Sequence, residues 1–102
     1  VLENLMNYPN PFSDFTRIHF EHNRPDDQLN VRMDIYDMNG KRIKSLTKHI
    51  SNGSYANSDF TWDGRSDRGA ALNSGIYICK VFISSDELQT ETAISSQMIL
   101  IK

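Results

Sequence analysis

The sequence has one cysteine, few glycines and prolines, and no long apolar run. Cys79 stands alone, so no disulfide can form within the chain. No segment approaches the roughly 18 apolar residues that a membrane-spanning helix needs. Eleven basic and 13 acidic residues give a formal net charge of -2, which argues against a general nucleic-acid binder, because such proteins carry a basic stripe or patch. The 102 residues fit one domain with a modest core and without a deep enclosed active site.

Metal-binding and nucleophile signatures are also absent. The three histidines, His19, His22 and His49, stand neither in an HExxH motif nor beside paired cysteines, so the spacing of a zinc site is missing. Cys79 lies in an apolar run, where a thiol packs as a small hydrophobic group. A catalytic thiolate would need an accessible position beside a base, which is the opposite environment.

The carboxylates favour turns over catalysis. Asp63 and Asp67 lie in WDGRSDRG, whose spacing is not that of a calcium-binding EF-hand and whose arginines oppose the negative charge. Asp26 and Asp27 stand in a loop beside a proline, and paired carboxylates for glycoside hydrolysis need an enclosed cleft. We therefore expect no metal, no cofactor and no catalytic residue in this chain.

Period-two alternation, broken by turn residues every 8 to 12 positions, dominates the chain. Residues 29–37 show it most clearly, with Leu29, Val31, Met33 and Ile35 on one face. We predict strands at residues 2–6, 15–22, 29–37, 41–50, around Phe60 and Trp62, at 75–84 and at 90–101.

Several positions refine this prediction. Asn39-Gly40 supplies the positive φ angles of a tight hairpin. Leu46 is out of phase with Ile43, which indicates a β-bulge in the return strand. The strand at 75–84 is apolar on both faces and should lie centrally, or have its second face covered.

The predicted fold is all-β: a seven-stranded antiparallel sandwich of two sheets, of immunoglobulin-like type, with Trp62 as the central core aromatic. The pattern does not reveal the order of the strands. The polar stretch FEHNRP at residues 20–25 reads as the end of a strand, because its proline removes a backbone donor.

Five segments, read in order, resemble a known family. They are NYPNPF at residues 7–12, TRIHF at 16–20, IYDMNGKRI at 35–43, WDGRSDRGAALNSGIYICKV at 62–81 and the terminal QMILIK. This ordered set resembles the C-terminal sorting domain of proteins exported by the type IX secretion system of Bacteroidetes. The FEHNRP form further resembles the terminal domain of that system's gingipain-like sortase, a cysteine peptidase whose catalytic residues would lie upstream of this chain.

The resemblance implies a recognition domain rather than an enzyme. Residues 1–102 would be a single C-terminal sorting and docking domain excised from a larger secreted protein, since the chain starts without a methionine or a signal peptide. Its partners would be the type IX translocon and an outer-membrane β-barrel shuttle protein. The protein would pass through the periplasm to the outer-membrane cell surface.

We expect the last strand to carry recognition, because a terminal strand can pair at an edge or insert into a groove. Its candidate residues are Met98, Ile99, Leu100, Ile101 and Lys102. Met98 and Leu100 share one face, and Ile99 and Ile101 the other, so filling the core and covering the second face is an alternative role. The turn at residues 7–12 is either a second recognition element or a rigid entry turn.

Two other functional classes stay open. An adhesion or carbohydrate-binding module would need an aromatic platform, for which Tyr36 and Tyr55 are the visible candidates. The Ig-like domain of flagellar hook-capping proteins shares the same general pattern. A homodimer through exposed strands also stays open.

Overall fold

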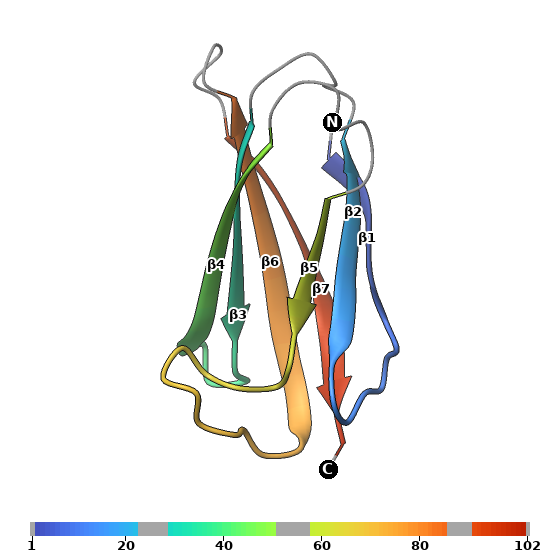
Figure 1. The fold of residues 1–102 in the computed structure, drawn as a ribbon, viewed down its shortest axis with the longest axis vertical. Helices are drawn as coiled ribbons and strands as arrows, with labels where there is room; N and C mark the ends of the chain where they lie inside the picture. The colour runs from blue at the N-terminus through green and yellow to red at the C-terminus, as the bar shows by residue number, and fades with distance from the viewer. Residues whose placement is uncertain (1, 23–28, 51–57, 86–90, 102) are drawn as a thin grey trace.

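The computed structural model describes residues 2–22, 29–50, 58–85 and 91–101, which form strands and no helix (Figure 1). None of these segments is therefore a helix that could span a membrane. The strands are β1 (Leu2–Tyr8), β2 (Thr16–His22), β3 (Leu29–Tyr36), β4 (Arg42–Ile50), β5 (Ser58–Trp62), β6 (Gly75–Ser85) and β7 (Glu91–Leu100).

The strands make two antiparallel sheets that face each other as a sandwich (Figure 1). The smaller sheet has the order β1-β2-β5 and the larger has the order β4-β3-β6-β7. The predicted seven-stranded, Ig-like sandwich is confirmed. The strand bounds agree with the prediction within about two residues at each described end. The order of the strands, which the pattern left open, places β7 at an edge of the larger sheet.

Trp62 lies at the centre of the core, as predicted. Its side chain is fully buried, and its indole Nε1 donates a 2.9 Å hydrogen bond to the carbonyl of Arg65. The rings of Phe12 and Tyr77 both lie 5.4 Å from its ring. The other buried apolar side chains come from both sheets: Ile18, Phe20, Leu29, Val31, Met33, Ile35, Phe60, Cys79, Val81, Ile83, Met98 and Leu100.

The central position predicted for the strand with two apolar faces is confirmed. β6 lies between β3 and β7 and pairs with both over most of its length. Its inward side chains belong to the core, whereas Ile78 and Phe82 on its outer face are only partly exposed. The guanidinium carbon of Arg32 lies 4.2 Å from the centre of the Phe82 ring, and this cation–π contact helps to cover that face.

The β3–β4 hairpin follows the predicted turn chemistry. Gly40 has a φ of 83°, and its N–H donates a 3.0 Å hydrogen bond to the carbonyl of Asp37. The Asp37 carboxylate accepts the N–H groups of Asn39 and Lys41. In the pairing of β3 with β4, Ile43 has no partner residue, which is the pattern of a β-bulge. Because of this bulge, Ile43 and Leu46 both pack against the core.

Asp34 departs from the simple alternation. It lies on the outer face of β3, as its parity predicts, yet its side chain is almost fully buried. Arg32 Nε lies 3.2 Å from Oδ2, Ser45 Oγ donates a 2.6 Å hydrogen bond to Oδ1, and Tyr36 donates to Oδ2. Arg42 lies 4.0 Å away. Long neighbouring side chains therefore enclose a carboxylate on the solvent side of the sheet, where its bonds to them offset the cost of burial.

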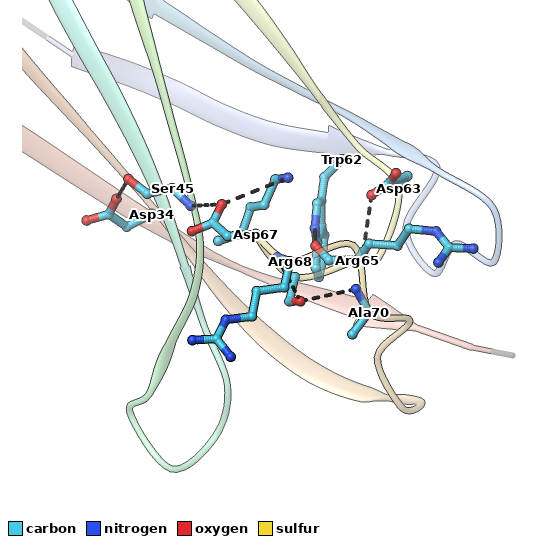
Figure 2. Close-up of polar contacts among 10 residues, drawn as sticks. Asp34, Ser45, Trp62, Asp63, Arg65, Asp67, Arg68 and Ala70 are labelled. Atoms are coloured by element: carbon cyan, nitrogen blue, oxygen red, sulfur yellow. Dashed lines mark hydrogen bonds and ion pairs between the residues drawn. The ribbon is translucent and has the colours of Figure 1, made fainter.

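The loop between β5 and β6 closes part of the β4 edge. The backbone N–H of Asp67 donates to the carbonyl of Ile43 at 3.0 Å, and its carboxylate accepts the N–H of Ser45 at 3.3 Å (Figure 2). Lys44 Nζ lies 4.0 Å from the same carboxylate. One residue thus satisfies two backbone groups at the open side of an edge strand.

Some predicted features lie outside the described residues. These are Asn23, Arg24 and Pro25 of FEHNRP, the Asp26–Asp27 pair, Tyr55 and Lys102.

We expect Trp62→Ala to lower the free energy of unfolding by about 3–5 kcal/mol, because it leaves a cavity in the core and removes the indole hydrogen bond. Thermal or denaturant unfolding measures the loss. Thr61→Ala is the matched control, since Thr61 is exposed on the same strand and should change stability by less than about 0.5 kcal/mol. Equal midpoints for Trp62→Ala and the parent chain would refute the central role of Trp62.

Candidate functional site

The described end of the last strand divides into a buried face and an exposed face. Met98 and Leu100 are 0% and 1% exposed and belong to the core, whereas Ile99 and Ile101 are 39% and 53% exposed. The two faces expected from the sequence are therefore present. The role of these residues in recognition remains a prediction.

The turn after β1 lies against this strand end. Phe12 N–H donates to the carbonyl of Ile99 at 3.0 Å, and Ile101 N–H donates to the carbonyl of Phe12 at 2.8 Å. These bonds form an isolated parallel bridge between Phe12 and Leu100. The N-terminal turn and the C-terminal end thus form one unit, and at this point the edge of β7 is already occupied.

The side chain of Asn10 extends this contact by one more residue pair. Its Oδ1 accepts the N–H of Ile99 at 3.0 Å, and its Nδ2 approaches the carbonyl of Gln97 at 3.5 Å. An asparagine amide carries both a donor and an acceptor, so it can imitate the backbone of a neighbouring strand. The sequence analysis left residues 7–12 as either a recognition element or a rigid entry turn, and it did not predict these bonds from Asn10.

Two cis peptide bonds, Tyr8–Pro9 and Asn10–Pro11, shape the turn. The fully buried hydroxyl of Thr16 donates a 2.9 Å hydrogen bond to the carbonyl of Pro9 and accepts one from Asn7 Nδ2 at 3.2 Å. Because this buried hydroxyl both donates and accepts a hydrogen bond, it fixes the turn to the start of β2.

Gly64 brings the β5–β6 loop onto the same end of the sandwich. It has a φ of 74°, and a Cβ at this position would lie 3.4 Å from Leu100 Cδ1. The ring of Phe12 lies on the same side, 3.8 Å from that point. A Cβ here would be in ordinary van der Waals contact with Leu100, but a side chain would be strained by the positive φ.

A third isoleucine joins the exposed face. Ile76 on β6 is the cross-strand partner of Ile99 and is likewise 39% exposed. Ile76, Ile99 and Ile101 form what we call the isoleucine patch. The sequence analysis predicted apolar side chains on both faces of the strand that contains Ile76. It could not join Ile76 to the last strand without the order and register of the sheet.

A second exposed apolar surface lies on the smaller sheet. Met6, Tyr8 and Phe15 are 55%, 79% and 51% exposed, and with Pro9 they line a shallow groove of about 300 Å³. Its exposed aromatics are not the pair that the sequence suggested for a carbohydrate platform. Tyr36 is half-buried and bonded to Asp34.

The candidate catalytic groups do not converge among the described residues. His19 is on β2 in the smaller sheet, and His49 contacts the Asn30 side chain at 2.9 Å on the larger sheet. Cys79 is 1% exposed in the core. Burial, and then the Asp34 carboxylate, raise the pKa of the Cys79 thiol to about 12, which disfavours the thiolate. Within the described ranges, no three histidine, cysteine or acidic residues lie close enough to hold a metal ion.

The two aspartates of WDGRSDRG make hydrogen bonds within the fold. Asp63 Oδ1 accepts the N–H of Arg65 at 3.1 Å, which is ordinary turn chemistry, and Asp67 points toward β4 (Figure 2). Arg65 donates to the carbonyl of Gly69 at 2.9 Å. The arginine therefore ties the loop to itself.

Comparison with known proteins identifies the family. The model of the FlgD Ig-like domain matches residues 10–87. The chain belongs to the FlgD Ig-like domain family. A search of curated proteins found no match. The matching family model is that of the FlgD Ig-like domain and not that of a type IX sorting domain.

Solved structures add more specific similarities. Dimeric latent PorU from Porphyromonas gingivalis has a region 28% identical to this chain, with a TM-score of 0.83, covering 99% of this chain and 9% of PorU. PorZ, a surface component of the type-IX secretion system of the same organism, is 17% identical with a TM-score of 0.53, covering 97% of this chain and 12% of PorZ.

A β-glucuronidase from Parabacteroides merdae is 12% identical with a TM-score of 0.61, covering 98% of this chain and 14% of the enzyme. The PorZ and glucuronidase similarities show the fold alone. This FlgD Ig-like domain spans less than a sixth of each of these three proteins.

We expect Asn10→Ala to loosen the end of the last strand without unfolding the domain. The substitution removes an acceptor for Ile99 N–H, so that amide should exchange with solvent faster, with a stability loss of about 0.5–1.5 kcal/mol. Hydrogen exchange followed by NMR measures both effects. Asn10→Asp retains the acceptor and should protect Ile99 nearly as well, and equal exchange at Ile99 in the parent and Asn10→Ala chains would contradict this role.

We expect Cys79 to react with a thiol reagent far more slowly in the folded chain than in denaturant. Raising its pKa from 9.0 to about 12 lowers the thiolate fraction at neutral pH about a thousandfold, and burial blocks access as well. The folded state favours the protonated thiol, so this contribution to stability is complete below pH 9 and declines as the pH rises toward 12. Ellman's reagent measures the rate, and Cys79→Ser gives the blank. Equal rates with and without denaturant would overturn this assignment.

Proposed function

We propose that this chain is a non-catalytic C-terminal signal and docking domain for type IX secretion. The observation that carries the proposal is the PorU similarity, which covers 99% of this chain at 28% identity. The proposed partners are the type IX translocon and an outer-membrane β-barrel shuttle protein. The proposed destination is the outer-membrane cell surface, reached through the periplasm.

The parent protein would then be a gingipain-like cysteine peptidase that acts as a sortase, with its catalytic domain upstream of this chain. Two observations support a separate location for catalysis. Cys79 is buried in the core, and His19 and His49 lie on different sheets. A domain with these features can bind a partner, but its described residues offer no nucleophile beside a base.

The proposed recognition surface is the isoleucine patch. Ile76, Ile99 and Ile101 expose apolar side chains next to one another, while Met98 and Leu100 hold the same strand in the core. Clustered exposed apolar side chains mark sites of protein interaction more often than scattered ones do. Lys102, also a candidate, lies beyond the described residues.

A structural domain of a flagellar hook-capping protein is the second candidate, because the family model is that of the FlgD Ig-like domain. The two functions differ in what precedes the domain in the parent protein: a peptidase in one, a flagellar assembly region in the other.

We expect the chain, fused behind a reporter with an export signal, to carry that reporter to the surface of a Bacteroidetes cell with an intact type IX system. Replacing both Ile99 and Ile101 with threonine should reduce surface reporter at least severalfold and weaken binding to the shuttle. Threonine keeps the β-propensity of the strand and leaves Met98 and Leu100 in place, so the domain should remain folded. Surface labelling measures export, and a dispersed NMR spectrum of the purified variant establishes folding.

The matched control replaces Met6 and Phe15, two residues of comparable exposure on the other sheet, with threonine. Its export should equal that of the parent chain. Full export by the folded Ile99/Ile101 variant would exclude the isoleucine patch as the recognition surface. Equal reporter display in a strain that lacks the translocon would reject the export function itself.

A further inference from the structure

The edge of β7 is closed over only part of its length. The bonds from residues 10–12 engage the outward backbone groups of Gln97, Ile99 and Ile101. Backbone groups alternate in direction along a strand, so Ala93 and Ser95 also direct their N–H and C=O groups away from β6. β1 of the smaller sheet approaches β7 near Ser96 and Met98, but no described strand is hydrogen-bonded to this side of β7.

The other three sheet edges carry features that prevent pairing. β1 has a register irregularity between Glu3 and Met6, and β5 is only five residues long. β4 has the bulge, the Asp67 contacts and a lysine-rich sequence. Bulges, short strands and lysines are the usual protections of exposed edges. Residues 91–97 have no bulge, no proline and no lysine, and their register with β6 is regular.

A groove on the outer face reaches this unprotected edge. It has a volume of about 440 Å³ and is lined by Tyr36, Asp37, Met38, Gly40, Ile78, Lys80 and Ser95. Ser95, the cross-strand partner of Lys80, has a small side chain and lines the groove on the side of this edge. A side chain from a strand placed beside β7 could therefore extend over Ser95 into the groove.

Lys80 and Asp37 are the two charged residues that line this groove, and the Asp37 carboxylate accepts the N–H groups of Asn39 and Lys41 in the turn. The Lys80 ammonium group lies 5.1 Å from the centre of the Phe82 ring, and no carboxylate of the described residues forms an ion pair with it. Asp34, on the neighbouring strand, already has Arg32 at 3.2 Å and Arg42 at 4.0 Å. Lys80 is the cross-strand partner of Asp34 and lies on the strand next to β7, and it has no acidic partner among the described residues.

We propose that residues 91–97 of β7 accept an extended peptide strand from a partner protein, and that an acidic side chain of that peptide, facing Ser95, pairs with Lys80. Added backbone hydrogen bonds would supply affinity and the acidic side chain would supply selectivity. A strand beside β7 would lie two strand spacings, about 10 Å, from β6. Extended glutamate and lysine side chains can together span that distance. This inference does not depend on the proposed export route, because the edge and the groove exist whatever delivers the domain.

The experiment titrates the isotopically labelled chain with the acetylated, amidated heptapeptide Thr-Val-Thr-Glu-Thr-Val-Thr and follows its amide signals by NMR. Shifts should concentrate at Ala93, Ser95 and Gln97. A second peptide with glutamine in place of glutamate should bind about twofold to fivefold more weakly. Lys80→Gln should weaken binding of the glutamate peptide equally and remove the difference between the two peptides.

Ser95→Pro tests the free edge of β7 without disturbing the rest of the fold. Its lost N–H points away from β6, so the ladder to β6 should remain and the spectrum should stay dispersed, while peptide binding should be lost. Ser95→Thr keeps the donor and should bind like the parent chain.

Three results would each overturn the proposal. They are no binding at millimolar peptide, unchanged binding by the folded Ser95→Pro chain, and shifts centred on β4 or β5. Self-association of the chain that Ser95→Pro abolishes would assign the edge to a second copy and would also overturn it. An export defect with intact peptide binding would bear on the proposed function alone.

Discussion

Two backbone hydrogen bonds between Phe12 and the last strand join the two ends of this domain. They connect residues almost 90 positions apart, and the Phe12 ring contributes to the same junction by packing on Trp62. Gly64 lets the β5–β6 loop approach Leu100 at this point. The described β1–β2 turn, the β5–β6 loop and the C-terminal residues therefore meet at one end of the sandwich (Figure 1). This junction fixes which face of the last strand is buried and which remains exposed.

The strands were predictable because each depends on local alternation and on nearby turn residues. The central position of β6 followed from its two apolar faces, and the bulge followed from the phase change between Ile43 and Leu46. The assignment of Met98 and Ile99 to opposite faces of the last strand followed from the alternation of side chains along a strand. These features need no knowledge of which strands become neighbours, so a single sequence is sufficient to predict them.

Most of the features that sequence analysis missed depend on contacts between residues far apart in the chain. The bond from Asn10 to Ile99 spans 89 positions, and the pairing of Ile76 with Ile99 needs the order of the larger sheet. The burial of Asp34 results from long side chains on its own and a neighbouring strand, which no alternation rule includes. Likewise, Tyr8 is the last residue of β1 before the proline-rich turn, and only the fold shows how far its ring is exposed.

The Asp67 contact on β4 has a consequence for assembly. A sheet that can be extended at both edges can grow copy by copy into a fibre, whereas a sheet extendable at one edge stops after a single addition. Asp67 occupies backbone groups of Ile43 and Ser45 with one residue of a loop, so part of this edge of the larger sheet is blocked without an extra strand. A second copy of the chain would meet this loop before it could pair along the whole of β4, which disfavours growth of the sheet in that direction.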